Sequence, residues 1–164
     1  MPDLEKLLDT AIELSDKGDK EKAVEIYLDI LKHREDWGAV HYNLGLYHKY
    51  ENNWEESFKY NNRAVELDPE NESSQWNLGI AATMLNEWKT ARQCWNFFGT
   101  KYEETANDPA GNIGITPIRI NPNSDAEVVW AKRIDPARAI IENIPFPESD
   151  RRFGDMILFE VAPM

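Results

Sequence analysis

The sequence predicts an α+β protein, in which an N-terminal α-solenoid of three helix pairs is followed by a small β-rich unit. Two observations support this division. The stretch HYNLGLYHKYENNW at residues 41–54 returns as QWNLGIAATMLNEW at residues 75–88, a repeat with a period of 34 residues, and a fixed period of this length is typical of helical solenoids. After residue 106 the repeat stops, and short runs rich in β-branched residues take its place.

The repeat fills about two thirds of the chain without gaps. The 34-residue offset pairs Gly45 with Gly79 and Trp54 with Trp88, and a weaker first copy keeps Gly18 at its turn. The expected copies are 4–37, 38–71 and 72–105.

Each copy is expected to form two helices. In the second copy the helices are predicted at 41–50 and 55–67, with the residues ENN in the turn between them. Asp68 and Pro69 are expected to end the second helix, because proline cannot continue a helix.

A glycine recurs inside the first helix of the second and third copies. Gly45 and Gly79 each cost about 0.5–1 kcal/mol relative to alanine at such a position. A packing reason is therefore expected, namely close approach of the second helix, where the small residues Ser57 and Ala91 are predicted to face them.

This pattern resembles the tetratricopeptide repeat (TPR) family over residues 4–105. Phe98 stands where the family prefers alanine, and GTKYEET at 99–105 lacks the usual proline, so the array is expected to end at about residue 106. The residues that carry the resemblance are Gly18, Asp19, Ala23 and Tyr27 in the first copy, Asn43, Leu44, Gly45, Trp54 and Ala64 in the second, and Trp76, Asn77, Leu78, Gly79, Trp88 and Ala91 in the third.

The remainder is expected to be a turn-rich linker, 107–114, and a small β-rich unit, 115–164. One run, 137–144, also has helical spacing, with Asp135 placed to cap a helix, but its shortness and the proline after it favour a strand. The apolar run 156–161 either pairs internally, or the chain is cut from a longer one. The predicted strands lie within 115–120, 127–134, 137–144 and 155–161.

Charge and composition argue against several functional classes. The net charge of −12 repels phosphate backbones, which argues against nucleic acid as a partner. No apolar run is as long as a membrane span, and the N-terminus lacks the apolar core of a signal peptide. Cys94 is the only cysteine, so an internal disulfide is excluded, and these features together favour a cytoplasmic protein.

No set of residues points to catalysis. Cys94 has no histidine evidently placed to activate it. His41 and His48 share a helix face but lie about 10 Å apart at a rise of ~1.5 Å per residue, too far to share one metal ion. We therefore predict packing roles for the histidines, no catalytic residue, no cofactor and no metal site. Trp130 is expected in the core of the β unit rather than as a platform for stacking bases.

The resemblance implies a partner-binding groove, because the first helix of each TPR repeat lines a concave face that holds a segment of another protein or peptide. Within each helix the residues expected there are four apart, and so form one stripe. Exposed apolar patches of this kind mark interaction sites. The predicted groove residues are Leu8, Ile12, Tyr42, Leu46, Tyr50, Trp76, Ile80 and Met84.

These observations favour a protein-interaction scaffold that is not an enzyme. Alternatives are a groove filled in cis by the rest of the chain or by a second copy in a homodimer, a secretion-type chaperone, and an enzyme whose chemistry lies in the β unit. TPR domains that clamp the C-terminal carboxylate of Hsp70 and Hsp90 use two lysines, two asparagines and an arginine. This chain has Leu8, Ile12, Asn43, Ser73 and Asn77 at those places, so chaperone-tail recognition is not expected.

Overall fold

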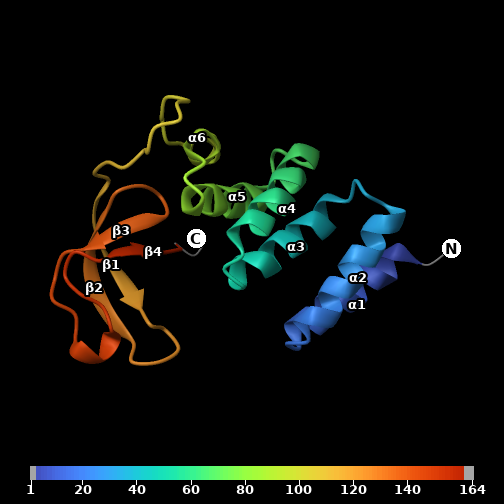
Figure 1. Cartoon of the computed structure of the whole chain (residues 1–164), viewed down its shortest axis with the longest axis horizontal. Helices are drawn as coiled ribbons and strands as arrows, with labels where there is room; N and C mark the ends of the chain where they lie inside the picture. Colours follow the sequence, from blue (N-terminus) through green and yellow to red (C-terminus); the bar gives the residue numbers. More distant parts are fainter. Residues whose placement is uncertain (1–2, 161–164) are drawn as a thin grey trace. The chain divides into compact units, whose positions relative to one another are not determined.

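The computed structural model describes residues 3–160 and divides the chain into two compact units, Met1–Ala106 and Asn107–Met164 (Figure 1). The first unit is helical and the second is built on a sheet. The predicted α+β class is therefore confirmed. That the two units are independent domains remains a prediction.

The helical unit consists of three consecutive helix pairs, as the repeat predicts (Figure 1). Each helix packs against its pair partner, and α2 packs on α3 and α4 on α5, so neighbouring pairs share an interface. The helices are α1 Leu4–Asp16, α2 Lys20–His33, α3 Gly38–Tyr50, α4 Trp54–Leu67, α5 Glu72–Met84 and α6 Trp88–Phe97.

The turns inside the pairs repeat with the sequence period. Gly18, Asn52 and Asn86, each 34 residues after the one before, have φ angles of +91°, +55° and +60°. Glycine and asparagine tolerate this left-handed conformation better than other residues. Asn53, directly after the second of these turns, and Asn71, in the loop between α4 and α5, cap the helices that follow them. Their side chains accept hydrogen bonds from backbone N–H groups in the first turns of α4 and α5.

The two repeated glycines lie where the second helix of the pair approaches closely, and Ser57 faces Gly45 as predicted, since its Oγ donates to Gly45 O at 2.9 Å. The side chains that come nearest to the place of a Cβ atom are larger ones, which were not predicted. A Cβ atom at Gly79 would lie 2.7 Å from the ring of Trp95, and one at Gly45 would lie 2.6 Å from Cγ of Asn61. Asn61 and Trp95 are again 34 residues apart, and are one turn further along the second helix than Ser57 and Ala91. The glycines therefore make room for the larger side chains of Asn61 and Trp95, in addition to the contact of Ser57 with Gly45.

The array ends at α6, which is shorter than the second helices of the other pairs. Gly99, with a φ of +95°, turns the chain out of the helix. Asn96 then holds the following segment, since its Oδ1 accepts hydrogen bonds from Thr100 Oγ1 at 2.9 Å and from the backbone N of Tyr102 at 2.8 Å. The next regular element is a strand, so the repeat does not continue.

The β unit is an antiparallel four-stranded sheet in the order β1-β2-β3-β4. The ambiguous run forms a strand, and Asp135 caps a tight turn instead of a helix, since its Oδ1 accepts from the backbone N atoms of Ala137 and Arg138 at 2.8 and 2.7 Å. β4 pairs internally with β3, so the expected internal pairing of the apolar run is found at residues 156–158. Residue 161 lies outside the described residues. The strands are β1 Gly114–Ile120, β2 Glu127–Arg133, β3 Arg138–Ile141 and β4 Met156–Leu158.

The sheet buries one face. Ile120, Val129, Ala131, Ala139, Ile141 and Ile157 form its core. Because side chains alternate along a strand, Val129 and Ala131 place Trp130 on the opposite face, where it is 54% exposed. The expectation that Trp130 lies in the core was therefore wrong.

A buried ion pair joins the predicted linker to the sheet. The Arg138 guanidinium donates from Nε to Asp135 Oδ2 at 2.5 Å and from two nitrogens to the carboxylate of Asp108, with Nη1 at 3.2 Å from Oδ2. The backbone N of Gly111 also donates to Ile134 O at 2.8 Å. Residues 107–113 are therefore packed as part of the β unit and do not form a free tether.

Candidate partner-binding site

The structure places the eight predicted groove residues at very different depths. Leu8 and Ile80 are buried, at 9% and 1% exposure, and so support the surface from below. Tyr42, Leu46 and Trp76 are half-buried. Ile12, Tyr50 and Met84 are exposed, at 38%, 59% and 40%. Tyr50 and Met84 are therefore the large apolar side chains at the C-terminal ends of α3 and α5 that a partner could reach directly.

Trp76 belongs more to the interior of its own repeat than to an open surface. Its ring meets the rings of Trp95 and Phe98 edge-on, with centroid distances of 5.2 and 5.3 Å. Trp95 is fully buried, so these contacts stabilise the α5–α6 pair. Phe98, which stands where TPR sequences prefer alanine, thus packs on the outside of this aromatic cluster at the end of the array.

A pocket of about 180 Å³ lies between α1, α2 and α3. Its walls include Tyr27, Leu46 and Tyr47, and Tyr50 and Asp16 also line it. Burial, and to a lesser degree the charge of Asp16, raises the pKa of Tyr27 to about 12. The phenol therefore stays neutral at physiological pH, and the pocket combines aromatic walls with a neutral hydroxyl.

Two lysines flank the exposed ring of Tyr50. Lys20 Nζ lies 5.4 Å and Lys49 Nζ lies 5.3 Å from the ring centroid, within the range of cation–π attraction. Lys49 is only 8% exposed, and its ammonium donates to Asn77 Oδ1 at 3.0 Å, which joins α3 to α5. Tyr50, the most exposed aromatic residue of the predicted groove, is thus held in place by Lys20 and Lys49.

Sequence reasoning missed Lys49 and Lys20. A signal for Lys49 was available, because it lies three residues after Leu46 and so on the same face of α3 as the predicted stripe. Its bond to Asn77 could not be foreseen, since the two residues are 28 positions apart. Lys20 begins α2 and reaches Tyr50 only through the packing of the first pair on the second.

The residues weighed for chemistry are packed among neighbours. Cys94 is 2% exposed, and burial raises the pKa of its thiol to about 12, the opposite of what a nucleophile needs. His41 Nε2 donates to Glu35 O at 2.7 Å, and the ring of His48 stacks on Tyr60 at 5.6 Å. Across residues 3–160 no three metal-ligating side chains of the His, Cys, Asp or Glu type come together. No helix in that range is long and apolar enough to span a membrane.

The comparisons with known proteins establish the fold of the helical unit. No family profile matches the sequence, and no curated protein matches it. Among solved structures, the second TPR of Spaghetti (RPAP3), bound to an HSP90 peptide SRMEEVD, has a TM-score of 0.53 at 20% identity, covering 57% of this chain and 82% of that one. The helical unit therefore has a TPR-domain fold.

Two further structures support the same conclusion. The Sgt2 TPR domain from Aspergillus fumigatus gives a TM-score of 0.52 at 18% identity, covering 59% of this chain and 64% of that one. A chain of the CopN–Scc3 complex gives 0.53 at 15% identity, covering 58% and 56%. The shared region is slightly more than half of this chain in each case.

Proposed function

We propose that this chain is a protein-interaction module whose helical unit binds an extended segment of a partner protein. The observation that carries the proposal is Tyr50, a large aromatic side chain that is 59% exposed yet fixed between two lysines at the mouth of a pocket. Aromatic residues held in this way are the usual anchors of protein interfaces. Fixing the ring in the free protein also lowers the entropy lost on binding.

The partner segment is expected to bring an apolar side chain to the pocket. The pocket beside Tyr50 has walls of Tyr27, Leu46 and Tyr47, and its volume suits one medium-sized side chain. Met84 offers a second apolar contact on α5.

The mode of binding differs from that of a clamp for a C-terminal carboxylate. The structure similar to this unit at 82% coverage holds the HSP90 peptide SRMEEVD. Of the five clamp positions only Asn43 keeps the clamp residue: Leu8, Ile12, Ser73 and Asn77 stand at the other four and supply no cation, and Asn77 is engaged by Lys49. The peptide SRMEEVD is therefore expected not to bind, and serves as a negative control.

The test compares surface variants that leave the fold intact. Tyr50→Ala and Met84→Ala should each weaken partner capture by about 2 kcal/mol, roughly 30-fold. Leu28→Ala is the matched control, since Leu28 is 41% exposed on α2, outside the predicted groove. Melting temperatures should stay close to wild type for all three. Equal capture by all three variants would show that the Tyr50 surface does not bind the partner.

A further inference from the structure

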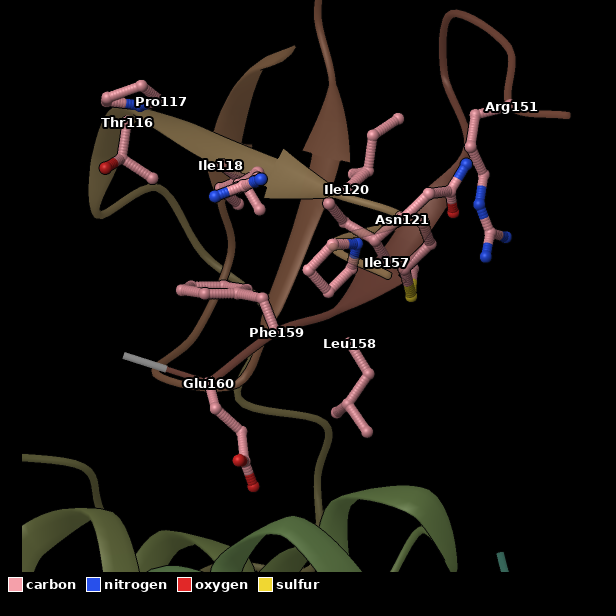
Figure 2. Close-up of a pocket in the computed structure, with 13 residues that line it drawn as sticks. Thr116, Pro117, Ile118, Ile120, Asn121, Arg151, Ile157, Leu158, Phe159 and Glu160 are labelled. Carbon is pink, nitrogen blue, oxygen red and sulfur yellow. The ribbon is translucent and has the colours of Figure 1, made fainter. Parts of the chain in front are cut away.

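A slot of about 800 Å³ lies between β1 and β4, within the β unit (Figure 2). Its lining includes Ile118, Ile120, Ile157 and Phe159, which belong to or pack on the core of the sheet. β1 and β4 are the two outermost strands of the sheet order. The sheet is therefore curved enough for its two edges to line one hollow, and the apolar core is open between them.

Within residues 3–160, the β4 edge of this slot carries backbone groups that pair with no other strand. Phe159 N donates to Ala137 O at 2.9 Å, and Ile141 N donates to Asp155 O at 3.0 Å, so residues 155 and 159 bond toward β3. Backbone groups alternate in direction along a strand. The N–H and C=O groups of Met156 and Leu158 therefore point away from β3, and among the described residues β4 pairs on one side alone.

The β1 edge is different because Pro117 interrupts it. Trp130 O accepts from Glu142 N at 2.8 Å, so the backbone of Trp130 bonds toward β3, and its partner across β1–β2 is Pro117. The backbone groups of residue 117 therefore face away from β2, where proline has no N–H to offer. A strand added in the slot would find a complete set of donors and acceptors on β4 but not on β1.

We propose that the slot binds a single extended peptide segment of a partner protein, which adds to β4 as a fifth strand. The slot has β4 on one side and β1 on the other, so a single strand fits between them more readily than the β4 edge of a second copy, which would bring its own β3 along. Main-chain hydrogen bonds to β4 supply affinity in such strand addition, and alternate side chains supply specificity. Every second side chain of the segment enters the apolar floor of the slot.

Charge complementarity adds a direction. Arg151 and Glu160 both line the slot and lie on opposite sides of it (Figure 2). An antiparallel strand, the more stable arrangement, runs with its C-terminal end beside the start of β4. The segment that fits best therefore has apolar residues at alternate positions and an acidic residue at its C-terminal end, near Arg151.

The experiment uses the full chain and a fluorescein-labelled synthetic peptide, KTVTVTVD, as the probe, with binding followed by fluorescence anisotropy. The same peptide with N-methyl groups on alternate amides cannot form the edge hydrogen bonds, and should bind at least about tenfold more weakly, which corresponds to ~1.4 kcal/mol. The charge-reversed peptide DTVTVTVK should bind more weakly than KTVTVTVD, and Arg151→Ala should reduce that difference.

Two variants of β4 provide a matched pair. Leu158→Pro removes one N–H from the open edge without touching the bonds to β3, and should weaken binding about tenfold. Leu158→Thr changes the same side chain but keeps the N–H, and should bind as wild type does. The N-methylated peptide keeps the test valid even if Leu158→Pro impairs folding.

Four results would overturn the proposal. The first is that KTVTVTVD shows no binding when the protein is present at about 1 mM, a concentration at which even a weak complex would form. The second is equal binding of the N-methylated peptide. The third is slow hydrogen exchange at the Met156 and Leu158 amides in the free monomer, which would show that the chain fills its own slot. The fourth is a dimer of the free protein that Leu158→Pro makes monomeric, which would assign the edge to a second copy.

Discussion

Gly79→Ala is expected to destabilise the helical unit, against the usual effect of this substitution in a helix. Alanine is favoured over glycine in a helix interior by about 1 kcal/mol. At this position, however, the added Cβ would lie 2.7 to 3.0 Å from three carbons of the Trp95 ring, which is rigid and fully buried. Forcing extra volume into a packed core costs about 1–3 kcal/mol. Since Trp95 also packs edge-on against Trp76, the ring has little room to move, and we expect a net loss of about 1–2 kcal/mol.

The assay is urea unfolding of the full chain followed by circular dichroism at 222 nm. Gly38→Ala is the control, because a Cβ there meets Leu67 at an ordinary 3.7 Å, and this variant should be neutral or slightly stabilising. In a Trp95→Leu background the cost of Gly79→Ala should disappear, since the contact that causes it is gone. A Gly79→Ala variant as stable as wild type, or the same cost in both backgrounds, would refute the packing explanation of the repeated glycine.

Two further predictions concern charged and titratable groups. Burial in the α3–α4 interface lowers the pKa of His48 from 6.5, an effect larger than the opposing pull of Glu56. The unfolded state then binds more protons than the folded state below pH 6.5, so stability should fall as the pH drops through that value, and His48→Gln should flatten the plot of melting temperature against pH between about 7.5 and 5.5. In the β unit, Arg138→Ala should lower the free energy of unfolding by about 3–5 kcal/mol, because it leaves the buried carboxylate of Asp135 without a cation. Asp108→Ala should lower it by about 1 kcal/mol or less, because the Asp108 side chain is 44% exposed. Hydrogen exchange of sheet amides would measure both, and equal effects would contradict the assigned burial of the pair.

Local signals accounted for most of the secondary structure. The 34-residue period located all three helix pairs, because each copy carries its own turn residues and its own apolar stripe. The turns at Gly18, Asn52 and Asn86 follow from backbone preferences that need no distant partner. The strands were predicted from β-branched runs between turn residues. The ambiguous run 137–144 was correctly predicted as a strand for the same local reasons, and contains β3.

Contacts between residues far apart in the sequence could not be predicted from the sequence alone. Trp130 was expected in the core because the net negative charge of the β unit argues against a platform for stacking bases. The alternation of β2 nevertheless turns it outward, and the register that decides this is set by pairing with β1 and β3. The small residues Ser57 and Ala91 were chosen to face the glycines by size. Ser57 does contact Gly45, but the side chains closest to the two glycines, Asn61 and Trp95, depend on how far one helix is shifted along the other.

For the candidate site, the sequence by itself determined which residues share a helix face, since spacing of four residues fixes that within one helix. Only the tertiary structure decided which of them a partner can reach: Ile80 is sealed by packing, whereas Tyr50 stands exposed between Lys20 and Lys49. The opening between β1 and β4 is likewise a tertiary property, because it depends on the curvature of the whole sheet. The local sequence pattern specifies helices and strands, because it acts through the conformational preferences of neighbouring residues. The exposure of a side chain and the presence of a cavity depend instead on how several helices or strands pack together, and no single stretch of sequence encodes that packing.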